Sequence, residues 1–163
     1  LQKATELGVS AIIPVLTERT EVRLDAERGE KRHQHWFGVI TAACGQSGRA
    51  QIPQLARTLP LATWLDQPPH PGLDHYDAHT GQRAPLIYLD PEAPNTLQTM
   101  GARVERGACL IVGPEGGLGE RDLAQLQAAG ATGMRLGPRI LRTETAGLAV
   151  IAAMQTLHGD FQA

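Results

Sequence analysis

The sequence predicts an α/β domain with a mostly parallel sheet flanked by helices. Short apolar runs typical of buried strands alternate with segments of helical periodicity along the chain. The 163 residues suit one domain with a single core, 1–163. With 42% hydrophobic and 20% charged residues, the composition is that of a folded globular protein and not of a disordered one.

The first half of the chain contains fewer regular elements. Residues 1–7 are expected to form a short helix that ends at Gly8. The apolar run 11–16 reads as a buried strand, although Pro14 disfavours a central position in a sheet. The clearest helix spans 30–44, because five side chains form an apolar stripe: Trp36, Val39, Ile40, Ala43 and Cys44.

Glycine and proline mark further boundaries. Gly45 is expected to end the helix 30–44. A short helix is expected over 60–66, with Pro60 near its first turn. Residues 67–83 are rich in Pro, Gly, His and Asp without periodicity, which indicates an exposed loop.

The second half alternates more regularly. Three buried strands are expected at 85–90, 108–113 and 132–137, and three helices at 95–100, 120–129 and 144–158. Asn95 is the expected cap of the first of these helices, and Thr143 of the last. In such sheets ligands bind beyond the carboxyl ends of the strands, which directs attention to three loops.

The last predicted helix carries no charged residue from Thr145 to Leu157. Its apolar side chains spread around most of its surface, so it is expected to be buried on several sides. Two interpretations remain open: a central helix in a monomer, or a helix that also contacts a second subunit.

Charge and composition exclude several classes. A net charge of −2 argues against nucleic-acid binding over the whole surface, though not at a local basic site. No apolar run approaches the length of a membrane span, and no signal peptide begins the chain. Cys44 and Cys109 are far apart and the histidine spacing fits no metal site, so we expect a cytoplasmic protein without a metal. The chain opens within a helical pattern and without Met, which suggests part of a longer protein.

The sequence "GPEGG" (113–117) joins an expected strand to an expected helix. It matches neither dinucleotide nor nucleoside-triphosphate glycine fingerprints, and Glu115 would repel a phosphate. It is either a tight connection or a loop whose backbone groups approach a ligand with a neutral or cationic part.

Arg135, Arg139 and Arg142 lie close together before Glu144. They form either a solvated face before a helix or an anion and nucleic-acid contact at a helix start. "GQSGR" (45–49) is a second polar cluster, which could equally be a helix C-cap. No hydrolytic triad or carboxylate pair stands out. The residues alone therefore predict a ligand-binding α/β domain.

Five stretches occur in an order and spacing that resemble the RsmE family: "KATELGVSAIIPV", "TERT", "AACGQSGR", "GPEGG" and "LGPRILRTETA". That family consists of SPOUT-class methyltransferases of 16S ribosomal RNA. The resemblance implies methyl transfer from S-adenosylmethionine to N3 of a uridine, a C-terminal deep trefoil knot and a homodimer. It also implies an N-terminal PUA-like RNA-binding domain that this chain lacks, and 16S rRNA or the assembled small ribosomal subunit as partner.

The resemblance also assigns site residues by position. The catalytic pair would be Arg142 and Glu144, and RNA would be bound by Gln46, Arg49 and Arg139. The cofactor would be bent and held largely by backbone groups of three loops: Leu89, Gly113, Pro114, Glu115, Gly116, Gly117, Leu136, Gly137, Ile140, Leu141, Arg142 and Thr143. One position departs from the family pattern, because Gly45 stands where its members usually have Glu.

The expected chemistry fits these side chains. Uracil N3 must lose its proton and align with the methyl group, so an enzyme contributes orientation and stabilises negative charge on the uracil oxygens. Arg142 suits this role because it stays protonated, with Glu144 fixing its guanidinium. The alternatives are a non-catalytic cofactor- or RNA-binding module, and a SPOUT methyltransferase with another RNA target.

Overall fold

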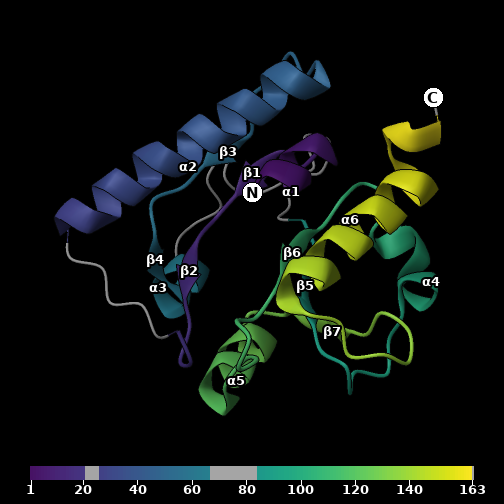
Figure 1. The fold of residues 1–163 in the computed structure, drawn as a ribbon. Helices are drawn as coiled ribbons and strands as arrows, with labels where there is room; N and C mark the ends of the chain where they lie inside the picture. The colour runs from purple at the N-terminus through teal and green to yellow at the C-terminus, as the bar shows by residue number, and fades with distance from the viewer. Residues whose placement is uncertain (21–25, 67–83, 163) are drawn as a thin grey trace.

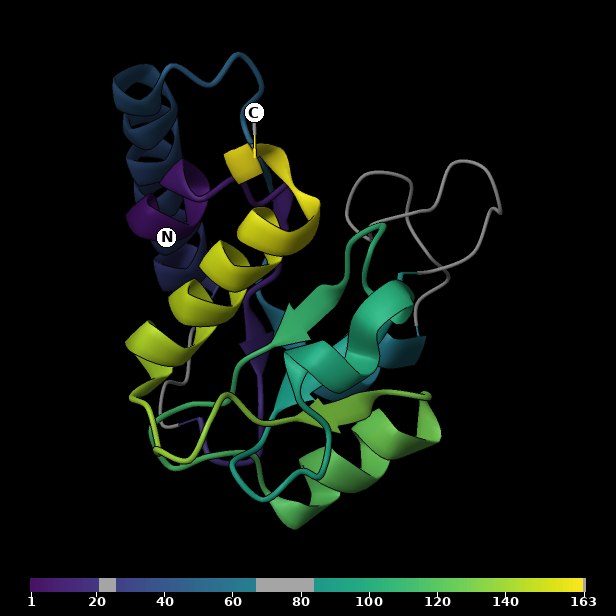
Figure 2. The same ribbon diagram turned by 90° about the vertical axis from the view of Figure 1, so that its right-hand side faces the viewer.

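A computed structural model describes residues 1–20, 26–66 and 84–162 and has the expected α/β architecture (Figures 1 and 2). Six α-helices and two 3-10 helices lie in the described part of the chain. Their bounds are α1 Gln2–Glu6, α2 Ala26–Ser47, α3 Leu61–Asp66, α4 Leu97–Met100, η1 Gly101–Arg103, α5 Glu120–Ala128, α6 Thr143–His158 and η2 Asp160–Gln162.

A three-stranded sheet of order β6-β5-β7 forms the centre of the second half. Its strands are β5 Leu86–Leu89, β6 Cys109–Ile111 and β7 Thr132–Met134. Both pairings are parallel: Ile87 lies opposite Leu110 on one side and Thr132 on the other. The mostly parallel sheet predicted from the alternating pattern is therefore confirmed for this part of the chain.

The first half contributes two further parallel pairs of very short strands. β1 (Ala11–Ile12) pairs with β3 (Gln54–Leu55), and β2 (Val15–Leu16) pairs with β4 (Leu59–Pro60). Pro14 separates β1 from β2 because it has no N–H to donate, although its carbonyl accepts a bond from Leu59 N at 3.3 Å. A single strand was predicted over 11–16, and β3 and β4 were not predicted.

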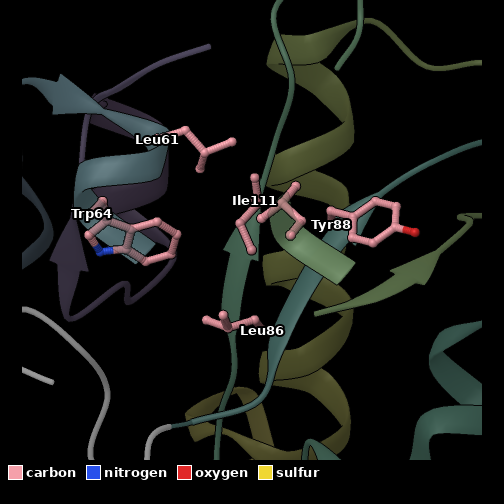
Figure 3. Close-up of a cluster of buried hydrophobic side chains, with 6 residues drawn as sticks. Leu61, Trp64, Leu86, Tyr88 and Ile111 are labelled. Carbon is pink, nitrogen blue, oxygen red and sulfur yellow. The ribbon is translucent and has the colours of Figure 1, made fainter. Parts of the chain in front are cut away.

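The central sheet buries both of its faces. Side chains alternate along a strand. Accordingly, Leu86 and Tyr88 of β5 join a cluster with Leu61 and Trp64 of α3 and with Ile111 (Figure 3). Ile87, between them in sequence, joins a second cluster on the other face, whose other members are Leu97, Met100, Val104, Met134 and Val150. Helices α3 and α5 thus cover one face, and α4 and α6 cover the other.

Two expected helix boundaries are wrong. The helix expected over 30–44 runs from Ala26 to Ser47, and Gly45 lies inside it because its backbone stays helical. The helix expected to start at Asn95 is capped by Thr96, whose hydroxyl accepts from Thr99 N at 3.3 Å. The Asn95 side chain instead donates to Gly133 O at 3.0 Å, which fastens the chain after β5 to β7.

The last helix begins one residue earlier than expected. α6 includes Thr143 and has Arg142 as its N-cap residue, without a side-chain capping bond. Of its apolar side chains only Val150 is fully buried within this chain. The exposed loop expected over 67–83 lies outside the described residues.

Candidate functional site

Three loops meet at one edge of the central sheet. Because β5, β6 and β7 run parallel, the segments that follow them all leave from the same edge. The structure therefore brings together Leu89 at the end of β5, the glycine loop 113–117, and the arginine-bearing loop 135–142. All of the residues predicted to hold a cofactor lie in or beside these three segments.

Backbone bonds fix the first loop to the third. Asp90 N donates to Met134 O at 3.0 Å, and Arg135 N donates to Asn95 O at 2.9 Å. These bonds continue the pairing of β5 with β7 past the ends of both strands. The two loops therefore form one rigid wall of the site.

The glycine loop needs two of its glycines for its path. Gly117 has a φ of 73°, in the left-handed region, and its N–H closes a turn onto Pro114 O at 2.8 Å. A side chain at Gly113 would stand 3.1 Å from the backbone N of Leu118. Residues 113–117 therefore form the tight connection that was one of the two interpretations of the sequence. It leaves Glu115 and Gly116 exposed toward solvent.

A segment from the first half of the chain contacts this glycine loop. Arg19 Nη1 donates to Gly116 O at 2.6 Å. The backbone N of Glu18 donates to both carboxylate oxygens of Asp122, each at 3.1 Å. No site role for Glu18, Arg19 or Asp122 was predicted from the sequence. The only available signal was the "TERT" stretch, which was used for the resemblance alone.

The third loop exposes the predicted catalytic and anion-binding side chains. Arg139, Arg142 and Glu144 are all exposed, and Gly137 turns the chain with a φ of 71°. Ile140 is 82% exposed, so its side chain is open to solvent at the tip of this loop. In the described part of the chain no ion pair joins Arg142 to Glu144.

Two predicted RNA-binding residues lie at a different place. Arg49 Nη1 donates to Thr5 O at 2.7 Å and to Val9 O at 2.9 Å, so it satisfies carbonyls at the end of α1. Gln155, near the C-terminal end of α6, donates to Leu7 O in the same region. Arg49 and its neighbour Gln46 therefore lie by the far end of α6 from Arg142, and one copy of the chain does not bring them to the sheet edge.

A groove of about 740 Å³ runs along α6. It extends from Thr143 and Glu144, beside the sheet edge, to Gln155 and His158 near α1. Its floor and opposite wall are mostly apolar residues of β1, β2 and β6. The predicted catalytic Glu144 thus lies at one end of a long apolar depression.

The described residues contain neither a metal-binding cluster nor a membrane-spanning helix. No group of three or more His, Cys, Asp or Glu side chains in that part of the chain is arranged to hold a metal ion. No helix described here is both long and apolar enough to cross a bilayer.

Comparison with known proteins identifies relatives of the whole chain. Residues 1–155 match the family model described as an RNA methyltransferase domain. The chain is 32% identical over 163 residues to the ribosomal RNA small subunit methyltransferase E of Mycobacterium tuberculosis, covering all of this chain and 59% of that protein. The Bacillus subtilis protein of the same name is 30% identical, with 98% and 62% covered.

Solved structures agree with this match. A ribosomal RNA small subunit methyltransferase E from Neisseria gonorrhoeae, bound to S-adenosyl methionine, is 41% identical with a TM-score of 0.82; 98% of this chain and 61% of that chain are covered. A putative methyltransferase from Legionella pneumophila, in complex with the cofactor SAM, is 34% identical with a TM-score of 0.80, covering 95% and 58%. The chain thus spans about 60% of the length of the relatives it matches.

Proposed function

Because this chain belongs to the RNA methyltransferase domain family, we propose that it transfers a methyl group from S-adenosylmethionine to N3 of a uridine in 16S ribosomal RNA. The observation that carries the proposal is the convergence of three loops at the sheet edge, in a fold shared with a neighbour bound to S-adenosyl methionine. The substrate would be 16S rRNA or the assembled small subunit, and the site of action the cytoplasm.

The cofactor would be held mainly by backbone groups of the three loops. The glycine loop brings its main chain close to solvent at Gly116, and the arginine-bearing loop does so at Gly137. Glu115 adds an exposed negative charge, which suits a ligand carrying a sulfonium and an ammonium and disfavours a phosphate. The remaining cofactor contacts would come from Leu89, Gly113, Pro114, Gly117, Leu136, Ile140, Leu141, Arg142 and Thr143.

In the proposed reaction the cofactor supplies an electrophilic methyl group. The methyl–sulfur bond would break as N3 attacks, which releases S-adenosylhomocysteine. Before that step N3 would lose its proton to solvent, which leaves a negative charge shared with the flanking carbonyl oxygens. Arg142, exposed at the start of α6, would donate hydrogen bonds to one of these oxygens. Glu144, exposed two residues further, would orient the guanidinium once the base is present.

Three further side chains are proposed to contact RNA. Arg139 lies in the same loop as Arg142 and is exposed, so it can reach a phosphate beside the target base. Gln46 and Arg49 lie at the other end of α6, near α1. Their contribution would therefore be to a more distant part of the RNA, or to the site of a second copy.

We also infer a homodimer and a deep trefoil knot. The apolar surface of α6 supports the dimer, since most of its side chains are only half-buried and Leu148, Ile151 and Met154 line the 740 Å³ groove. A second copy that packs its own α6 region into this groove would cover them. The knot would thread the segment containing α6 through the loops at the sheet edge, which would make their mutual position rigid.

Calorimetry with S-adenosylmethionine tests the first step of the proposal. We expect one site per chain. A bulky residue at the loop, Gly137→Val, should weaken binding at least tenfold, because Gly137 has a left-handed φ and Val would distort the backbone there. The matched control is Gly29→Val, a helical position with open space around it. Failure of the unsubstituted chain to bind the cofactor would overturn the proposal.

The methyl-transfer step needs a second assay. Small ribosomal subunits lacking the uridine methyl group are incubated with the chain and labelled cofactor, and the product nucleoside is identified by mass spectrometry. Arg142→Ala should lower turnover about 10²-fold or more, because one oxyanion donor is worth that much. Cofactor binding without transfer to any RNA would instead favour a non-catalytic module, and methylation of another RNA would reassign the substrate.

A further inference from the structure

The turn Thr17–Thr20 after β2 is itself a rigid unit. Thr20 N donates to Thr17 O at 3.1 Å, and Thr17 N donates to the Thr20 hydroxyl at 2.9 Å. These reciprocal bonds hold the two residues between them, Glu18 and Arg19, in a fixed orientation. Both of these side chains lie at the exposed rim of the glycine loop.

Asp122 connects this turn to the start of α5. Its carboxylate is 2% exposed and accepts three backbone bonds: two from Glu18 N at 3.1 Å and one from Gly119 N at 2.9 Å. In return the Glu18 carboxylate accepts from Arg121 N at 3.2 Å, in the first turn of α5. The glycine loop is thus anchored at its C-terminal end by residues far away in the sequence.

Arg19 holds the middle of the same loop. Its Nη1 donates to Gly116 O at 2.6 Å, and its aliphatic stem would lie 3.6 Å from a side chain built at Gly116. This carbonyl belongs to the same peptide unit as the Gly117 N–H, which donates to Pro114 O at 2.8 Å, so both polar groups of that unit are bonded. A charged donor on that oxygen selects one orientation of the loop backbone.

We infer that Arg19 is a positioning residue for the cofactor loop, acting together with Glu18 and Asp122. The inference rests on the proposed function, in which this loop binds S-adenosylmethionine through its backbone. A loop with several glycines has many conformations in solution, and fixing one of them in advance removes part of the entropy cost of binding. Arg19 would therefore set cofactor affinity without touching the reacting atoms.

The experiment compares Arg19→Ala, Arg19→Lys and the control Arg121→Ala. Arg121 has the same charge and lies in the first turn of α5, but its bond to Glu18 uses the backbone N–H and survives the substitution. We expect Arg19→Ala to raise the cofactor dissociation constant and KM about tenfold with kcat nearly unchanged, as loss of a charged hydrogen bond implies. Arg19→Lys should restore part of the affinity, and Arg121→Ala should leave it within about twofold.

Amide hydrogen exchange at Gly117 supplies a readout independent of the cofactor. Its N–H closes the turn onto Pro114 O, so its exchange reports opening of the loop. Arg19→Ala should speed this exchange about tenfold while amides of β5 keep their rates. Unchanged exchange and unchanged affinity in Arg19→Ala would overturn the inference. Faster exchange in a chain that binds no cofactor would sustain the anchoring role while refuting the proposed function.

Discussion

Gly133 has only a hydrogen atom in place of a side chain, and the packing of β7 beside β5 depends on this. It lies opposite Tyr88 in the parallel pairing of β7 with β5, and a methyl group there would come 2.9 Å from the Tyr88 ring. A buried aromatic ring between two layers cannot move aside easily. The close approach of the two strands at the sheet edge therefore depends on glycine.

Gly133→Ala should lower the free energy of unfolding by about 1–3 kcal/mol, the usual cost of overpacking a core. Urea denaturation followed by circular dichroism measures it. Gly38→Ala is the matched control, since an added methyl there meets nothing within 4 Å on α2. Equal stabilities of Gly133→Ala and the unsubstituted protein would show that the ring can move.

Gly45, which stands where members of the family usually have Glu, should tolerate substitution by alanine. It is helical and exposed, and nothing lies within 4 Å of an added Cβ. Gly45→Ala should therefore stabilise the protein by about 0.5–1 kcal/mol. Gly48→Ala, three residues further, should do the opposite because Gly48 has a φ of 72°. Thermal unfolding of the two variants should shift in opposite directions, and a loss of stability in Gly45→Ala would contradict this account.

Glu30 gives the chain a measurable pH dependence. The Arg57 side chain bonds its carboxylate and lowers the pKa of Glu30 below the ordinary value. A group with a lowered folded pKa stabilises the protein above its unfolded pKa and loses that contribution as the pH falls through the folded pKa. Arg57→Gln should thus raise the Glu30 pKa in an NMR titration and flatten the acid side of the stability curve. The effect should be small because the pair is exposed.

Some site residues could be predicted from the sequence, and others could not. The spacing indicated Arg139 and Arg142 as a basic cluster before Glu144, the family resemblance assigned their roles, and all three are exposed beside the sheet edge. Arg19 and Asp122 could not be identified, because their partners lie about a hundred positions away and no local pattern signals such contacts. Asp122 looks like an ordinary first-turn acid of α5 until its buried carboxylate is seen to bind Glu18.

At the scale of elements, α5 depends on this contact for its start. Its N-cap is Gly119, which has no side chain, and Asp122 satisfies the Gly119 N–H instead. A methyl group at Gly119 would overlap the Glu18 carboxylate, so that side chain would have to shift. The helix start, the turn after β2 and the glycine loop therefore form one structural unit.

Asp122→Ala should destabilise the protein by about 2–4 kcal/mol, because it leaves backbone N–H groups of Glu18 and Gly119 without an acceptor. The control Glu120→Ala removes an exposed acid from the same turn and should cost no more than about 1 kcal/mol. Chemical denaturation separates the two. A comparable loss in both variants would mean that only the helix dipole matters.

The elements themselves were predictable where local chemistry determines them. The strands near 86 and 109 follow from apolar runs, the strand near 132 follows from the alternation of strands and helices, and α6 follows from its long uncharged pattern. The strands β3 and β4 were missed because each is two residues long and is stabilised by its partner strand, not by its own sequence. Gly45 failed as a helix end because packing of Ile40, Ala43 and Cys44 carries the helix past it.

At the scale of the whole molecule, the parallel arrangement was predictable and the assembly remains a proposal. Light scattering on a size-exclusion column should give a mass of about twice 17.5 kDa for the chain. Leu148→Arg, in the groove along α6, should yield a folded monomer because the charge cannot be buried in an apolar interface. Ile52→Arg, at an exposed position outside the groove, should leave the mass unchanged. A monomeric mass for the unsubstituted chain would refute the dimer.

The four strand pairings in the described residues are all parallel, and this has a consequence for how the molecule folds. Ala11 pairs with Gln54, more than forty positions later, and Ile87 pairs first with Leu110 and then with Thr132. Such long separations slow folding, because loop closure must precede any reward from contacts. On a ribosome, Ile87 would leave the exit tunnel well before Thr132 does. Strand β5 would therefore spend that interval with its β7-facing edge unpaired, when a chaperone that shields apolar strands should bind most strongly.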